Sequence, residues 1–109
     1  MRIRVSSANG IAVTEQDKDT IQHDLEKIDR RLAEFREEIS ADVRISYAQS
    51  ATAGKAHHVL IELDFGRNHL IAKADNADVG QAVREAREEL LRQINDRKRG
   101  GHTARAKGL

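Results

Sequence analysis

The 109-residue chain contains no cysteine, no proline and no tryptophan. Without cysteine it holds neither a disulfide framework nor a thiolate metal site. No apolar run reaches the roughly 20 residues that a membrane-spanning helix needs, and residues 1–5 lack the apolar stretch of a signal peptide. We therefore expect a soluble, cytoplasmic protein that forms a single domain.

Aromatic residues are also scarce, at 3% of the chain: Phe35, Tyr47 and Phe65. Modules that bind single-stranded RNA stack its bases on exposed aromatic rings. We expect the hydrophobic core to take most of these three rings, which leaves almost none for stacking. Recognition of A-form RNA by its shape, phosphates and 2′-hydroxyls needs positive charge but few aromatics, so it remains compatible with the composition.

The net charge of +1 conceals an uneven distribution. Residues 1–91 hold 13 basic and 17 acidic side chains, whereas residues 92–109 hold six basic side chains and one acidic side chain. This basic end has two explanations that charge alone does not separate. It contacts a polyanion such as RNA, or it complements a helix dipole and keeps helix faces solvated.

Alternation of polar and apolar residues predicts four strands, over residues 2–5, 43–47, 59–65 and 70–74. The small and polar residues 48–56 predict a loop between the second and third strands. Residues 66–68 predict the hairpin turn between the third and fourth strands.

Two amphipathic helices complete the pattern. The first, of about 20 residues, begins at Thr14, which can form a capping box with Asp17. Its apolar stripe consists of Ile21, Leu25, Ile28, Leu32 and Phe35. The second is predicted over about residues 78–98, with Asp78 as its N-cap and the glycine pair 100–101 as its stop.

The resulting order β-α-β-β-β-α predicts an α+β two-layer sandwich, in which a four-stranded sheet carries both helices on one face. The first two strands are expected to be parallel neighbours, because a helix connects them, and the remaining strands a meander. The other face of the sheet should be largely solvated. We assign residues 1–99 to this domain and residues 100–109 to a flexible basic tail.

No motif of an enzyme is present: the chain has no nucleophile elbow, P-loop or dinucleotide-binding fingerprint. We therefore expect no catalytic residue and no cofactor. His57 and His58 are adjacent on a strand and should point to opposite faces, while His69 lies across the hairpin and could approach one of them. We favour polar strand residues over a metal site, because their spacing matches no known ligand set.

Three stretches of the sequence resemble one known family. Residues 1–5 and 13–15 look like its opening strand and helix start, and residues 41–45 look like its second strand. The best match runs without gaps from His69 through Asp78 to Lys98. Over about residues 1–99 the chain resembles the bacterial ribosome hibernation promoting factor and ribosome-associated inhibitor family, which includes the sigma-54 modulation proteins and ribosomal S30AE.

The resemblance implies the β-α-β-β-β-α fold, which has been compared to double-stranded RNA-binding domains. It also implies a non-catalytic protein that binds the small ribosomal subunit, with its 16S rRNA, in the channel of messenger RNA and of the A- and P-site transfer RNAs. Such proteins silence translation in stationary phase or stress. No membrane or small-molecule partner is implied, and a homodimer is left open. Long members add a C-terminal dimerisation domain, so this chain is expected to be a short form.

The resemblance also nominates RNA-binding residues. Basic positions that match the family's surface, or continue it, are Lys73, Arg92, Arg97, Lys98 and Arg99. Three more match only by helix and face: Lys27, Arg30 and Arg31. Gly80, Arg84 and Glu89 stand where the family usually has an aromatic, an acid and a lysine. These departures motivate an alternative, a divergent member that acts as a protein-interaction or regulatory module without ribosome binding.

Overall fold

The computed structural model describes residues 1–8, 11–33, 38–47 and 56–107, with side chains of the last helix described as far as Asp96. Its elements are β1 (Arg2–Ser7), α1 (Glu15–Arg31), β2 (Ile39–Tyr47), β3 (His57–Phe65), β4 (Asn68–Asn76) and α2 (Val79–Lys107). This is the predicted order, and the α+β class is confirmed. The predicted loop at 48–56 lies, apart from Ala56, outside the described residues.

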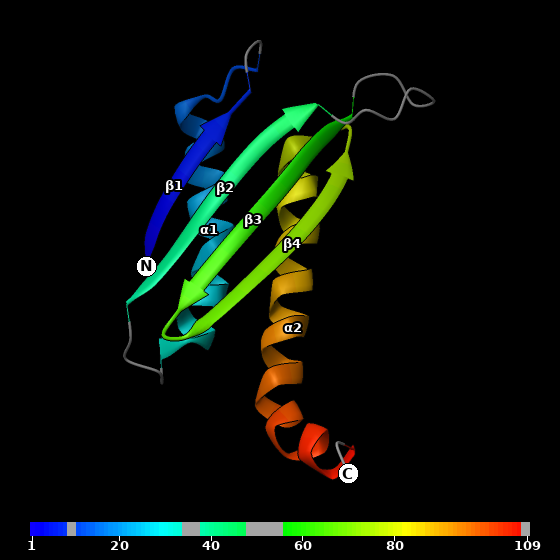
Figure 1. Ribbon diagram of the computed structural model, residues 1–109. Helices are drawn as coiled ribbons and strands as arrows, with labels where there is room; N and C mark the ends of the chain where they lie inside the picture. The colour runs from blue at the N-terminus through cyan, green and yellow to red at the C-terminus, as the bar shows by residue number, and fades with distance from the viewer. Residues whose placement is uncertain (9–10, 34–37, 48–55, 108–109) are drawn as a thin grey trace.

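The four strands form one sheet in the order β1-β2-β3-β4 (Figure 1). β1 and β2 are parallel, as expected for strands joined through a helix, and Val5 lies opposite Val43. The other two pairings are antiparallel. A two-residue turn joins β3 to β4, and its Gly66 has φ 58°, a conformation that glycine adopts without steric cost.

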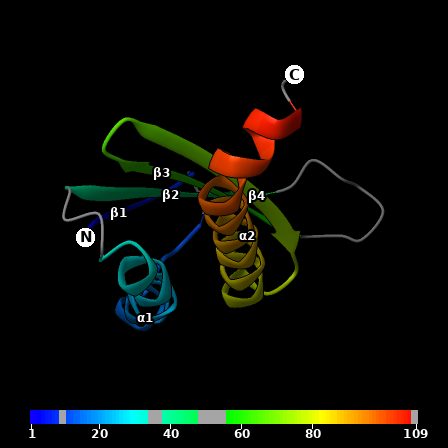
Figure 2. The same ribbon diagram turned by 90° about the horizontal axis from the view of Figure 1, so that it is seen from below.

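Both helices lie on the same side of the sheet (Figure 2), so the structure has two layers. Inward-facing strand residues and the apolar stripes of the helices form the core, which includes Leu25, Val43, Ile61, Leu63 and Leu90 at 0% exposure. The opposite face of the sheet carries the alternate residues of each strand, which are mostly polar but include Leu60 and the 43% exposed Ile71. On β4, for example, Ala72 is buried while the neighbouring Lys73 is exposed.

Helix α1 begins with the predicted capping box. Thr14 Oγ1 accepts a hydrogen bond from the Asp17 amide at 3.0 Å, and the Asp17 carboxylate accepts one from the Thr14 amide at 3.1 Å. The stripe Ile21, Leu25, Ile28 and Leu32 is buried as predicted. Phe35, the fifth member of the predicted stripe, lies outside the described residues.

Helix α2 begins where the sequence predicts. The Asp78 carboxylate accepts a hydrogen bond from the Gly80 amide at 3.2 Å, which is the geometry of an N-cap. The predicted stop at residues 100–101 is wrong, because α2 continues through both glycines to Lys107. Glycine ends a helix only when it adopts the left-handed conformation, and the lysine, arginine and alanine residues around this pair favour helix. The flexibility of residues 100–109 stays a prediction.

A buried ion pair joins the two helices. Arg87 Nη1 of α2 lies 3.0 Å from Asp24 Oδ1 of α1, and their side chains are 5% and 8% exposed. Arg87 Nη2 also donates to Glu88 at 2.5 Å. Asp24 Oδ2 and Arg87 Nε are buried without hydrogen-bond partners in the described structure. Removal of either charged group would leave its partner charged and buried, which is costly.

We expect Asp24→Ala to lower the free energy of unfolding by about 3–5 kcal/mol, because the buried Arg87 then keeps only the exposed Glu88 as a counter-charge. The double variant Asp24→Leu/Arg87→Met should regain most of this loss, since it leaves no unpaired charge. Urea unfolding followed by circular dichroism measures both effects. Equal stability of Asp24→Ala and the parent chain would contradict the prediction.

Candidate nucleic-acid interface

The two helices run side by side in the same direction (Figure 1). Asp24 pairs with Arg87 halfway along α1, and Arg31 in its last turn donates two hydrogen bonds to Asn95 Oδ1, at 3.0 and 2.8 Å. The C-terminal ends of α1 and α2 therefore lie at the same end of the molecule. The C-terminal end of α1 carries partial negative charge from its free carbonyls, which favours cationic side chains there.

Helix α1 brings three of the predicted residues to this end. Lys27 and Arg30 are exposed, and in the described part of the chain neither has an ion-pair partner. Arg31 is exposed and bonded to Asn95. Lys27 and Arg30 thus present charge that no described carboxylate neutralises.

Helix α2 carries three more beyond the edge of the sheet. The backbone at Arg97, Lys98 and Arg99 is helical and continues past the end of β3 and β4 (Figure 1). Their side chains lie outside the described ones. We refer to Lys27, Arg30, Arg31 and residues 97–99 together as the cationic end.

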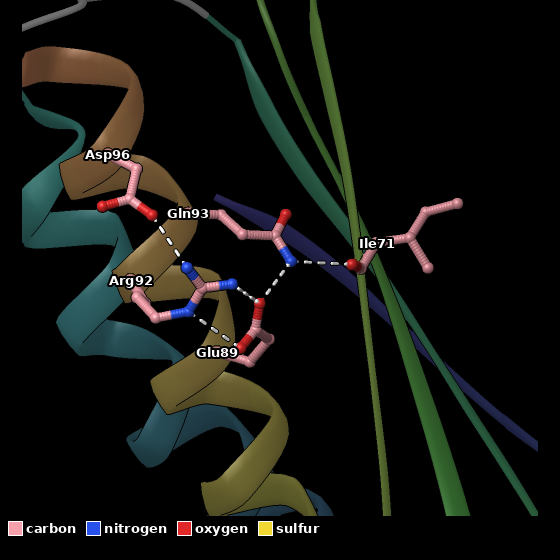
Figure 3. Close-up of polar contacts among 5 residues, drawn as sticks. All are labelled: Ile71, Glu89, Arg92, Gln93 and Asp96. Atoms are coloured by element: carbon pink, nitrogen blue, oxygen red, sulfur yellow. Dashed lines mark hydrogen bonds and ion pairs between the residues drawn. The ribbon is translucent and has the colours of Figure 1, made fainter. Parts of the chain in front are cut away.

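Arg92, in contrast, is held by carboxylates of its own helix (Figure 3). Its guanidinium donates to both Glu89 oxygens, at 3.1 and 2.5 Å, and to Asp96 at 2.8 Å. The side chain is 61% exposed, so water screens these contacts. The neighbouring Glu88 does not bond Arg92, and it accepts a hydrogen bond from Arg87 instead.

Gln93, which also bonds the Glu89 carboxylate, ties α2 to the sheet. The Gln93 amide donates to Glu89 at 2.9 Å and to the backbone carbonyl of Ile71 in β4 at 3.0 Å (Figure 3). Hydrogen bonds from Arg92 and Gln93 hold the pKa of the Glu89 carboxyl below its usual value. The hydrogen bond to Glu89 raises the pKa of Arg92.

Lys73 lies apart from the other predicted residues. It projects from the open face of the sheet, opposite the face that carries both helices (Figure 2). A single flat partner on the helix side would not reach it. The structure thus brings α1 and the end of α2 together, but it does not join them with Lys73 into one stripe.

Two histidines, His58 and His69, form separate pairs with carboxylates on the open face. His58 hydrogen bonds with Asp75, while His69 bonds Asp64 at 2.6 Å and lies 3.6 Å from Glu62. The disfavoured alternative, an approach of His69 to a strand histidine, does not occur, because the register sets His69 opposite Asp64 and His58 opposite Asp75. Among the described residues no group of three potential ligands is placed to hold a metal ion.

Comparison with known proteins agrees with this architecture. The sequence model described as "Sigma 54 modulation protein / S30EA ribosomal protein" matches residues 3–100. The chain belongs to this family. Members of the sigma 54 modulation and S30EA family are non-catalytic, ribosome-associated inhibitors of translation, so the family confirms the prediction that the chain is not an enzyme. No curated protein matched the sequence.

Two solved structures share the fold. The Protein Y N-terminal domain of Thermus thermophilus is 23% identical, with a TM-score of 0.71 over 86% of this chain and 96% of that one. A ribosomal subunit interface protein from Coxiella burnetii is 13% identical, with a TM-score of 0.73 over 90% of this chain and 98% of that one. At these identities the likeness shows the fold.

Across the described ranges, the helices include none with an apolar stretch long enough to cross a membrane.

Sequence reasoning missed two features of the helix side. Asn95, which accepts hydrogen bonds from Arg31, is uncharged, so an analysis of charge patterns does not identify it. Tyr47 is 43% exposed, although the core was expected to take most aromatics. Its place as the last residue of a strand, just before a polar segment, is the signal that favours exposure.

The His69–Asp64 pair gives a pH-dependent prediction. Its hydrogen bond with Asp64 raises the pKa of His69. The stabilisation should therefore be complete below the pKa of an unfolded histidine and disappear as pH rises through the folded pKa. In Asp64→Asn we expect the His69 pKa to fall, measured by NMR titration of the imidazole protons. An unchanged His69 pKa would show that Asp64 is not its cause.

Proposed function

We propose that the protein binds the small ribosomal subunit in the cytoplasm and inhibits translation during stress or stationary phase by occupying the messenger and transfer RNA sites. The observation that carries this proposal is the family match over residues 3–100. The parallel helices support it, because they gather basic residues from α1 and α2 at one end of the fold. The similar structure from Coxiella burnetii is described as a ribosomal subunit interface protein.

In this proposal the cationic end contacts phosphates of 16S rRNA. Each lysine or arginine that neutralises a phosphate releases a bound counterion, so affinity falls steeply with salt. Phosphate contacts orient the protein without reading sequence. Inhibition then needs no catalytic group, because a bound domain excludes messenger and transfer RNA sterically.

In this proposal the eight nominated residues take different roles. Lys27 and Arg30 are exposed and can contact phosphates without breaking an ion pair of the described structure. Arg97, Lys98 and Arg99 belong to the same end. Arg92 contributes only if it exchanges Glu89 and Asp96 for a phosphate. Lys73 contributes only where RNA also reaches the open face.

One observation favours a second candidate function, a regulatory module that binds another protein. Glu89 stands where the family usually has a lysine, and it neutralises Arg92 rather than leaving it for RNA. A protein partner would be captured from cell extract regardless of RNase treatment. Ribosome capture would be RNA-dependent and salt-sensitive.

Co-sedimentation with purified small subunits tests the first proposal. We expect the protein to pellet with the subunits at low salt and to be released as salt rises. Lys27→Glu should weaken pelleting and lower the slope of log affinity against log salt by about one to two, since it removes one phosphate contact and adds repulsion. Lys18→Glu, at the other end of α1, is the matched control and should bind nearly as the parent chain does. Absence of pelleting at low salt would overturn the proposal.

The acidic replacement on α2 makes a further prediction. Glu89→Gln keeps the hydrogen-bonding capacity toward Gln93 but removes the charge that neutralises Arg92. We expect subunit affinity at low salt to rise a few-fold, on the order of one weakened surface ion pair. Asp19→Asn changes the net charge equally on exposed α1 and should have a smaller effect. Equal effects of both variants would mean that Arg92 does not contact the subunit.

A further inference from the structure

Tyr47 and His57 form an exposed ring pair at one end of the sheet. They face each other across the β2–β3 ladder, with ring centroids 5.5 Å apart and planes inclined by 39°. Tyr47 is 43% exposed, whereas Phe65 is 3% exposed and belongs to the core. Among the described residues Tyr47 is therefore the aromatic ring that remains available to a ligand.

The histidine ring is held in place by the backbone. His57 Nδ1 lies 2.9 Å from the carbonyl oxygen of Ala77, just before α2. A carbonyl only accepts, so Nδ1 carries the hydrogen and Nε2 has the free lone pair of the neutral ring. Within the described structure the Tyr47 hydroxyl makes no hydrogen bond. The pair thus offers a ring surface of fixed orientation, with two polar groups at its rim.

The pair lies on the helix side of the molecule. Tyr47 continues the inward series Val43 and Ile45, and His57 precedes the inward Val59. Helix α2 starts beside His57 and passes through the cationic end, so the pair and residues 97–99 are about 30 Å apart along this helix. An RNA surface that covers the helix side would meet both.

We propose that Tyr47 and His57 form a stacking platform for an unpaired base of the small-subunit RNA. This rests on the proposed function and adds a contact that does not depend on phosphate charge. Every base has a π-face, so such a platform accepts a base without reading its identity. The preset orientation of His57 reduces the entropy that a base must overcome on binding.

Affinity for purified small subunits, measured at low and moderate salt, tests the platform. Tyr47→Ala should weaken binding by about 5- to 150-fold, the range for loss of one stacked base. The factor should be the same at both salt concentrations, unlike that of Lys27→Glu. Tyr47→Phe is the matched control and should bind as the parent chain does. Circular dichroism checks that the variants fold, which is expected because the side chain is exposed.

A second measurement uses the absence of tryptophan from the chain. Tyr47→Trp introduces one indole as a fluorescent probe at the platform. We expect a single-stranded oligoribonucleotide to quench its emission, and the same strand within a duplex to quench it less at equal occupancy, because paired bases are already stacked.

The outcomes separate this inference from the proposed function. If the parent chain does not bind subunits, the proposed function fails. If it binds and Tyr47→Ala binds equally well, the platform fails alone. An equal loss in Tyr47→Phe would assign the contact to the hydroxyl and overturn stacking. Loss on intact subunits without quenching by protein-free RNA would point to a ribosomal protein and also overturn it.

Discussion

Asp24 and Arg87 meet between α1 and α2, with one direct contact of 3.0 Å and almost no access to water. Burial of two charges is costly, so this pair has little value for stability compared with an apolar contact of the same shape. Its value lies in placement. Together with the Arg31–Asn95 hydrogen bonds, the pair sets how the two helices lie along each other, and the cationic end follows from that placement.

The overall architecture could be predicted because each element carries its own local signal. Period-two alternation marks the strands, and Thr14 with Asp17 marks the start of α1. The end of α2 could not be predicted in the same way. A glycine pair ends a helix in some contexts and is part of it in others. Here the two glycines favour a helix end, whereas the lysine, arginine and alanine residues around them favour a continued helix.

The candidate site was less predictable than the fold. The sequence identifies which residues are basic, but their availability depends on neighbours that only the folded chain supplies. Glu89 and Asp96 stand three residues before and four residues after Arg92, and this spacing on a helix indicates that their carboxylates can neutralise the Arg92 charge. The placement of Lys73 on the open face follows from alternation with Ala72, yet its distance from the helix side requires the packing of both layers. Residue type alone also does not tell which aromatic stays exposed: Tyr47 is 43% exposed, whereas Phe65 is 3% exposed.

The hydrogen bond from Gln93 to the Ile71 carbonyl affects more than the position of α2. β4 is an edge strand, and free backbone groups on an edge can recruit a strand from another molecule. The Gln93 amide occupies one of these groups, and the adjoining helix restricts approach from that side. At this point β4 is therefore less open to pairing with a strand from another molecule.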